Sequence, residues 1–207
     1  LVVRPPDPGP QPRAFSHEGA PDQAWAMIGW STFGGTERLR ERRALALAAN
    51  IFRVRLFDRF REAEGASYSP GAIHTSSETF PDWGVFYAAA EVRPENAAAF
   101  FRAAREILAD MAAAPAAPDE FARAQNPVLS GIERRLATNA YWLSAMEDWA
   151  TRPAAIDETR TYLADYRAMT AEDVRAAVAA HVAESGDWSM LVVPARAGAA
   201  IEERRGE

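Results

Sequence analysis

The chain has 207 residues, of which 48% are hydrophobic and 25% charged, a composition typical of a soluble globular domain. Its net charge of -6 disfavours nonspecific binding to nucleic acid, which requires a basic surface. Cysteine is absent, which excludes disulfides, thiol catalysis and cysteine metal sites, and no apolar run approaches the ~18 residues of a membrane span. All 23 basic side chains are arginines, which favour planar, bidentate recognition of carboxylates or carbonyls.

The N-terminal part is predicted to be a linker followed by a strand and a long helix. Residues 1–19 form the linker and lead-in, because the proline-rich stretch RPPDPGPQP suits neither helix nor central strand. Residues 24–30 are apolar without clean alternation, which is typical of a strand covered on both faces. A helix over residues 37–64 follows, with apolar residues at helical spacing and a charged run at 37–43 interpreted as a solvated face. The chain starts with leucine and no signal peptide is visible, so we expect it to belong to a longer protein.

Gly65 is predicted to end the long helix, since glycine adopts the left-handed conformation that such an end requires. A strand over residues 67–77 and a second over 84–92, joined by a short polar loop, then form an antiparallel hairpin. Further elements are predicted from periodicity and end signals: helices over residues 94–111, 118–146 with a kink at Pro127, 156–167 and 170–181, and a strand over 188–193.

This order predicts an α+β fold. We expect a two-layer sandwich in which a mostly antiparallel sheet of about four strands carries helices packed on one face. A single domain should cover residues 20–195, and residues 196–207 should form a flexible tail. Strand 84–92 is apolar at both alternating sets of positions, so the second sheet face should lack a cover and meet a crystal neighbour or another copy of the chain, as in a homodimer.

Most catalytic motifs are absent from the sequence. His17, His74 and His181 are too far apart to form a two-histidine helix face, and neither HxxEH nor HExxH occurs. The sequence also contains no GxSxG nucleophile elbow and no phosphate-binding glycine loop. The chain is therefore predicted to hold no metal and no other cofactor.

Arg61 and Tyr68 are the remaining candidates for chemistry. Arg61 falls in the last turn of the predicted long helix and Tyr68 just beyond the turn at Gly65, which brings a guanidinium and a phenol close together. In one interpretation they are structural, a helix-end arginine and a half-buried strand tyrosine. In the other they donate hydrogen bonds to a substrate carbonyl or developing oxyanion. The residues alone do not decide between the two.

The stretch RLFDRFREAEGASYSP, residues 55–70, resembles the R-L-x-x-x-x-R-E-x-x-G-x-x-Y-S signature of the pitrilysin/insulinase zinc metalloproteases, specifically their C-terminal, non-metal-binding half. Other segments resemble bacterial periplasmic members of the family in the same order: Asp22-Gln23-Ala24, Pro81-Asp82-Trp83-Gly84, Asp119-Glu120, Asn139-Ala140-Tyr141-Trp142 and Thr170-Ala171-Glu172-Asp173-Val174. The resemblance spans residues ~20 to ~195, most of the chain.

The resemblance implies a division of labour between two α+β halves that face one another across a substrate chamber. The N-terminal half carries HxxEH and zinc, whereas the C-terminal half supplies an arginine and a tyrosine to the peptide substrate. On the matching positions, Tyr68 would donate to the scissile carbonyl and Arg61 would hold a neighbouring peptide carbonyl.

The zinc half is missing from this sequence, so the resemblance implies that this chain alone cleaves no peptide. Its expected partners are the N-terminal zinc-binding half, as the same protein or a partner subunit, and a peptide substrate, with no nucleic acid and no membrane. The resemblance also suggests a periplasmic location. The alternative is a family relative that has lost chemistry and serves as a structural or regulatory partner.

Overall fold

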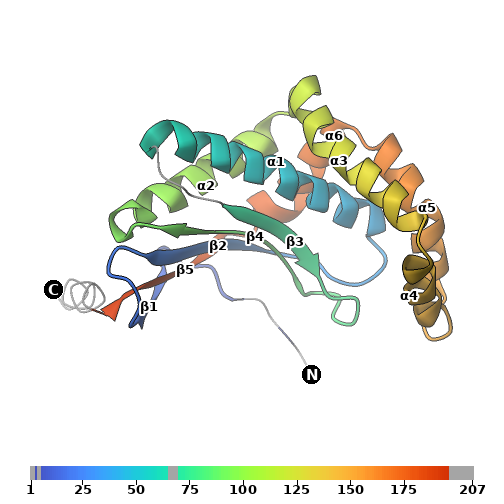
Figure 1. Cartoon of the computed structure of the whole chain (residues 1–207), viewed down its shortest axis with the longest axis horizontal. Helices are drawn as coiled ribbons and strands as arrows, with labels where there is room; N and C mark the ends of the chain where they lie inside the picture. The colour runs from blue at the N-terminus through green and yellow to red at the C-terminus, as the bar shows by residue number, and fades with distance from the viewer. Residues whose placement is uncertain (1–2, 4–5, 65–69, 196–207) are drawn as a thin grey trace.

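The computed structural model describes residue 3 and residues 6–64 and 70–195, including all side chains in these ranges except those of residues 61–64 and 148. The described chain forms an α+β fold of two layers, a five-stranded sheet and a set of helices on one of its faces (Figure 1). The strands are β1 (Arg13–His17), β2 (Ala24–Thr32), β3 (Gly71–Ser76), β4 (Gly84–Val92) and β5 (Asp187–Pro194). The predicted fold class, with its helices on one face, is confirmed.

The sheet has the order β1-β5-β2-β4-β3, and every neighbouring pair is antiparallel except β1 with β5. The mostly antiparallel sheet agrees with the prediction, but it has five strands rather than about four. The additional strand is β1, which lies in the stretch expected to be a lead-in. It pairs with β5 from Arg13 opposite Met190 to His17 opposite Pro194, so its backbone groups are satisfied by a partner far along the chain.

The helices are α1 (Leu39–Glu64), α2 (Ala97–Ala113), α3 (Pro118–Leu136), α4 (Asn139–Trp149), α5 (Ala154–Ala168) and α6 (Ala171–Val178), with short 3-10 and π segments at Pro94–Asn96 and Ala179–Ala183. The prediction of one helix over residues 118–146 is wrong. Helix α3 continues through Pro127 but ends at Leu136. Thr138 separates it from α4, because its Oγ1 donates to the Arg135 carbonyl at 2.8 Å and accepts from the Tyr141 N–H at 3.3 Å.

One face of the sheet packs against the helices and forms the core. On β2 this face carries Ala24, Ala26, Ile28 and Trp30, all at most 3% exposed. The Trp30 ring contacts Phe52 of α1 and Phe86 of β4 edge-on, at centroid distances of 6.0 and 6.2 Å. These aromatic contacts fix α1 over the middle of the sheet.

The opposite sheet face has no described helix over it (Figure 1). Strand β2 is therefore covered on one face only, and the prediction of a strand covered on both is wrong. The open face is apolar and carries exposed side chains on three strands: Phe15, Trp25 and Ile73, at 52%, 45% and 51%. Gly29 leaves room here for the Trp188 ring, since a Cβ at Gly29 would lie 2.3 Å from it.

The loop before α1, residues 33–38, is hydrogen-bonded to the loop of the β3–β4 hairpin, residues 77–83. The Gly34 N–H donates to the Pro81 carbonyl at 2.6 Å and the Gly35 N–H to the Ser77 carbonyl at 2.7 Å. A Cβ on Gly34 would lie 2.1 Å from the Phe80 carbonyl oxygen, and Gly35 has a φ of 79°. Only glycine meets both demands, so these two residues fix where α1 begins.

Candidate functional site

Arg61 lies in the last turn of α1, which ends at Glu64 as the sequence predicted. The Arg61 side chain, Gly65 and Tyr68 fall outside the described residues. The proximity of Arg61 to Tyr68, and their role toward a substrate, therefore remain predictions. The described part of α1 nevertheless shows how the end of this helix is held.

A bidentate ion pair ties α1 to the start of α3. Arg55 donates from Nε to Glu120 Oε1 at 2.7 Å and from an Nη to Oε2 at 2.8 Å. Both side chains are largely buried, with 25% and 18% exposed. The hydrogen bonds with Arg55 lower the pKa of Glu120, and those with Glu120 raise the pKa of Arg55, so the pair is charged at neutral pH.

Two further contacts hold the same part of α1. Leu56 and Phe60 are at most 5% exposed, and the Phe60 ring lies 5.8 Å from that of Phe100 on α2. Arg59 pairs with Glu106 of α2 at 3.1 Å, but both side chains are half exposed, so this contact is weak. The sequence indicated the apolar contacts by their spacing, whereas it gave no signal for the Arg55–Glu120 pair.

The three histidines come from different elements, and the rings of His74 and His181 both pack against Phe33, at centroid distances of 6.2 and 4.7 Å. His17 is the last residue of β1 and its Nδ1 accepts a hydrogen bond from the Gly19 N–H. His74 lies on β3, and His181 lies in the π segment after α6. Among the described residues no three His, Asp or Glu side chains come together in a way that could hold a metal ion. The residues of this part of the chain therefore do not fit a zinc site.

His74 lies on the helix-covered side of β3 and its Nε2 is 3.1 Å from the Thr32 hydroxyl. Burial is the main cause that lowers the pKa of His74 from 6.5 to about 4. A hydrogen bond with the Arg42 backbone opposes this by raising the pKa, whereas the nearby charges of Arg42 and His181 lower the pKa by smaller amounts. The ring is thus neutral at physiological pH and serves the packing of the core.

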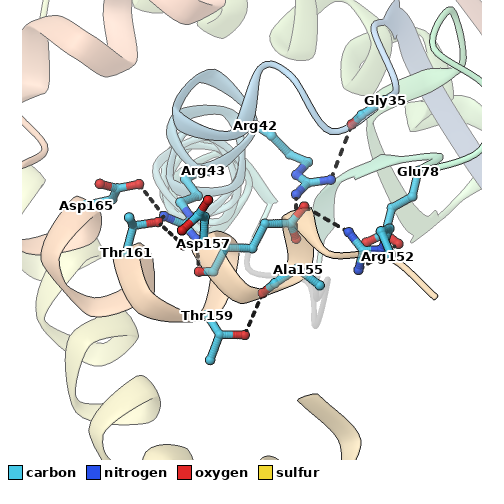
Figure 2. A network of polar contacts seen from close by, with 11 residues as sticks. Gly35, Arg42, Arg43, Glu78, Arg152, Ala155, Asp157, Thr159, Thr161 and Asp165 are labelled. Atoms are coloured by element: carbon cyan, nitrogen blue, oxygen red, sulfur yellow. Dashed lines mark hydrogen bonds and ion pairs between the residues drawn. The ribbon is translucent and has the colours of Figure 1, made fainter. Parts of the chain in front are cut away.

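The first turns of α1 border a polar cavity of about 470 Å³ between β3, α4 and α5. Arg43 is 5% exposed and donates to the Asp165 carboxylate, the Thr161 hydroxyl and the Glu158 carbonyl (Figure 2). Arg42 and Arg152 share the Glu158 carboxylate at 3.3 and 2.9 Å. The charged run at 37–43, interpreted as a solvated face, is therefore partly an internal ion-pair network that joins α1 to α5.

Within the described residues no helix is long and apolar enough to cross a membrane. No curated protein sequence matches the chain. Residues 2–128 match the family described as "Peptidase M16 inactive domain".

Solved structures with the same fold share little sequence with the chain. The chain superimposes on a peptidase M16 inactive domain from Pseudomonas fluorescens with a TM-score of 0.71 and 16% identity, covering 93% of this chain and 46% of that one. The periplasmic protease PqqL from Escherichia coli gives 0.71 and 14%, covering 88% and 20%. An inactive peptidase domain of a candidate zinc protease from Bordetella parapertussis gives 0.67 and 16%, covering 86% and 96%. The chain thus spans less than half the length of the first two chains and nearly all of the third.

Proposed function

Since the chain belongs to the family of peptidase M16 inactive domains, we propose that it is the substrate-binding half of a zinc-dependent metalloendopeptidase. The resemblance to the non-metal-binding half of the pitrilysin family is confirmed by this membership. The family match carries the proposal, and the lengths of the similar chains support it, because two of them are more than twice as long as the part that this chain covers.

In this proposal Tyr68 donates a hydrogen bond to the scissile carbonyl oxygen as negative charge develops on it, and Arg61 holds a neighbouring peptide carbonyl. Removal of one such oxyanion donor typically costs ~3–4 kcal/mol of barrier. The end of α1 at Glu64 supports the assignment, since it places Arg61 about one helical turn before residue 65, where the segment that carries Tyr68 begins.

The metal and the group that activates water would come from an N-terminal half, in the same polypeptide or a partner subunit. The described residues of this chain do not fit a zinc site, so the chain alone should cleave no peptide. A periplasmic location is part of the proposal, supported only by the periplasmic protease among the similar structures.

The test is the rate of peptide cleavage by the full-length protein, followed with a short internally quenched peptide. Tyr68→Phe should lower kcat/KM by roughly 10²-fold with an unchanged melting temperature, because one oxyanion donor is lost and the ring remains. Arg61→Lys should also lower it, since an ammonium cannot replace the planar fork.

A structural role for the two residues predicts the reverse. Tyr68→Phe would then leave kcat/KM unaltered and Arg61→Lys would lower the melting temperature. The second candidate function, a non-catalytic structural or regulatory subunit, fits the same family description, because an inactive domain needs no active partner. It predicts that the full-length protein has no chelator-sensitive peptidase activity at all.

A further inference from the structure

We propose that the polar cavity beside the first turns of α1 binds a small organic carboxylate, and that Arg135 is the group that pairs with the carboxylate. The cavity borders α1 from residue 39 to residue 46, whereas Arg61 lies in the last turn of the same helix. The inference therefore does not rest on the proposed function, and it concerns only residues that the structure describes.

The size and the wall of the cavity suit an organic molecule. Its volume of about 470 Å³ is that of a small-molecule site, which typically measures ~300–1,000 Å³, and exceeds what a bare ion fills. The wall combines arginine and tyrosine side chains with four apolar ones, Leu39, Ala46, Ala145 and Ala155. A ligand with one charged group and an apolar body would contact both kinds of side chain.

Four arginines line the cavity among the described residues, and three of them are paired with carboxylates. Arg43 donates to the Asp165 carboxylate. Arg42 and Arg152 share the Glu158 carboxylate at 3.3 and 2.9 Å (Figure 2). These contacts compensate the three charges and hold the side chains in place before any ligand binds.

Arg135, the fourth arginine, has different surroundings. It lies in the last turn of α3, donates to the Tyr162 hydroxyl and stacks over the Tyr162 ring at 5.3 Å. Within the described part of the chain these are the polar contacts of its guanidinium group, and neither brings a negative charge. A guanidinium group has several N–H donors, so donors remain for a ligand.

The tyrosines of the wall do not supply the missing charge. Arg43 stacks over the Tyr162 ring as well, also at 5.3 Å, so two guanidinium groups share one phenol. Burial raises the pKa of Tyr166, which lies edge-on to Tyr162, to about 12. The nearby charges of Arg43, Arg135 and Arg42 oppose this shift, so three cations surround a neutral phenol. A carboxylate beside Arg135 would compensate this positive charge through two parallel hydrogen bonds.

The experiment measures binding to the 207-residue chain at pH 7 by nuclear magnetic resonance titration. The probes are N-acetylleucine and benzoate, each compared with its uncharged amide. At least one acid should bind with a Kd below about 10 mM, and its amide at least about 10-fold more weakly. Arg135→Gln should weaken binding of the acid at least about 10-fold. Arg134→Gln removes the same charge from the neighbouring residue, which is not part of the cavity wall, and should change the Kd by less than about twofold.

A second pair of variants tests whether the acid binds in this cavity. Ala145→Phe places a ring in the cavity and should abolish binding, because the space for the ligand is filled. Ala140→Phe is the matched control, since Ala140 lies on the same helix, is exposed and does not line the cavity.

Three results would overturn the inference: no acid binding below about 10 mM, equal binding of acid and amide, or a Kd that Arg135→Gln leaves unaltered. Arg135 would then serve only the end of α3, where a cation interacts favourably with the helix dipole. Inorganic phosphate bound more tightly than both acids would overturn the assignment to an organic carboxylate. If Arg135→Gln lowers the melting temperature, Arg135→Lys takes its place. It keeps the charge but loses the planar fork, and should weaken binding at least about threefold.

Discussion

The two faces of the sheet are built from similar residues but have opposite surroundings. On β2, Trp30 is 3% exposed beneath α1, whereas Trp25, on the same strand, is 45% exposed on the open face. On β4, Phe86 lies under the helices at 0% exposed, and the alternate residues Val85 and Ala89 on the other face are apolar as well. A strand that is apolar on both sides usually has a cover on both sides.

All the described helices thus lie on one face of the sheet, and the second face carries none of them (Figure 1). The covered face is held by aromatic packing and carries a partly buried histidine, His74. The open face combines Phe15, Trp25 and Ile73, large side chains whose exposure together on one surface is unusual for a monomeric domain. Stability should therefore come from one face and association from the other.

The largest expected effect separates the two tryptophans of β2. Trp30→Ala should lower the free energy of unfolding by about 4 kcal/mol, because it leaves a cavity between Phe52 and Phe86. Trp25→Ala should lower it by less than about 1 kcal/mol, since the side chain is already half in water. Urea unfolding of the two variants measures both values, and equal losses would break the comparison.

A second expected effect is acid sensitivity of the covered face. The unfolded chain protonates His74 near pH 6.5, but the folded chain does so only near the lowered pKa of about 4. Stability is therefore fully present above pH 6.5 and falls as the pH drops toward 4, by about 2–3 kcal/mol at pH 4.5. His74→Gln should flatten this part of the stability curve.

Urea unfolding at pH 7 and pH 4.5, with and without His74→Gln, makes the measurement. His17→Gln is the matched control, because His17 lies on the edge strand β1 and on the open face of the sheet, away from the core around His74. An identical pH slope in the wild-type chain and His74→Gln would show that other groups cause the acid sensitivity.

The smallest expected effect concerns the open face. If another copy of the chain covers it, the isolated chain should self-associate, and Trp25→Ser combined with Ile73→Thr should weaken association at least about 10-fold. Sedimentation velocity over a range of concentrations measures this, with the melting temperature as control. A wild-type chain that stays monomeric at the highest concentration would remove the homodimer prediction and leave the face to a different partner.

The elements with local signals were predictable from sequence. Strand β4 has the predicted bounds, because Gly84 and the Arg93-Pro94 step mark its ends, and α1 ends at Glu64 just before the expected Gly65. Strand β1 was missed because it is short, half exposed and depends on β5, a partner that no local pattern indicates. The break between α3 and α4 was not predicted, because the apolar residues keep helical spacing across it and the capping hydroxyl of Thr138 is only a weak local signal.

The candidate site, too, was predictable only where the sequence carries a local signal. The positions of Arg61 and Tyr68 follow from a contiguous motif, although their geometry lies outside the described residues. The Arg55–Glu120 pair joins residues 65 positions apart, and a chain with 23 arginines and 29 acidic residues offers far too many combinations to select one. The pairing depends on the tertiary packing that brings the start of α3 next to α1. The hydrophobic periodicity of the sequence does not predict such packing.

The parallel pairing of β1 with β5 also gives the domain a mechanical character. Both strands point the same way, from Arg13 beside Met190 to His17 beside Pro194. Tension between the two ends of the chain would therefore pull β1 and β5 in opposite directions along their length, loading their hydrogen bonds together instead of one after another. We therefore expect this pair of strands to resist a pulling force between the two ends of the chain, because several hydrogen bonds would have to break at once.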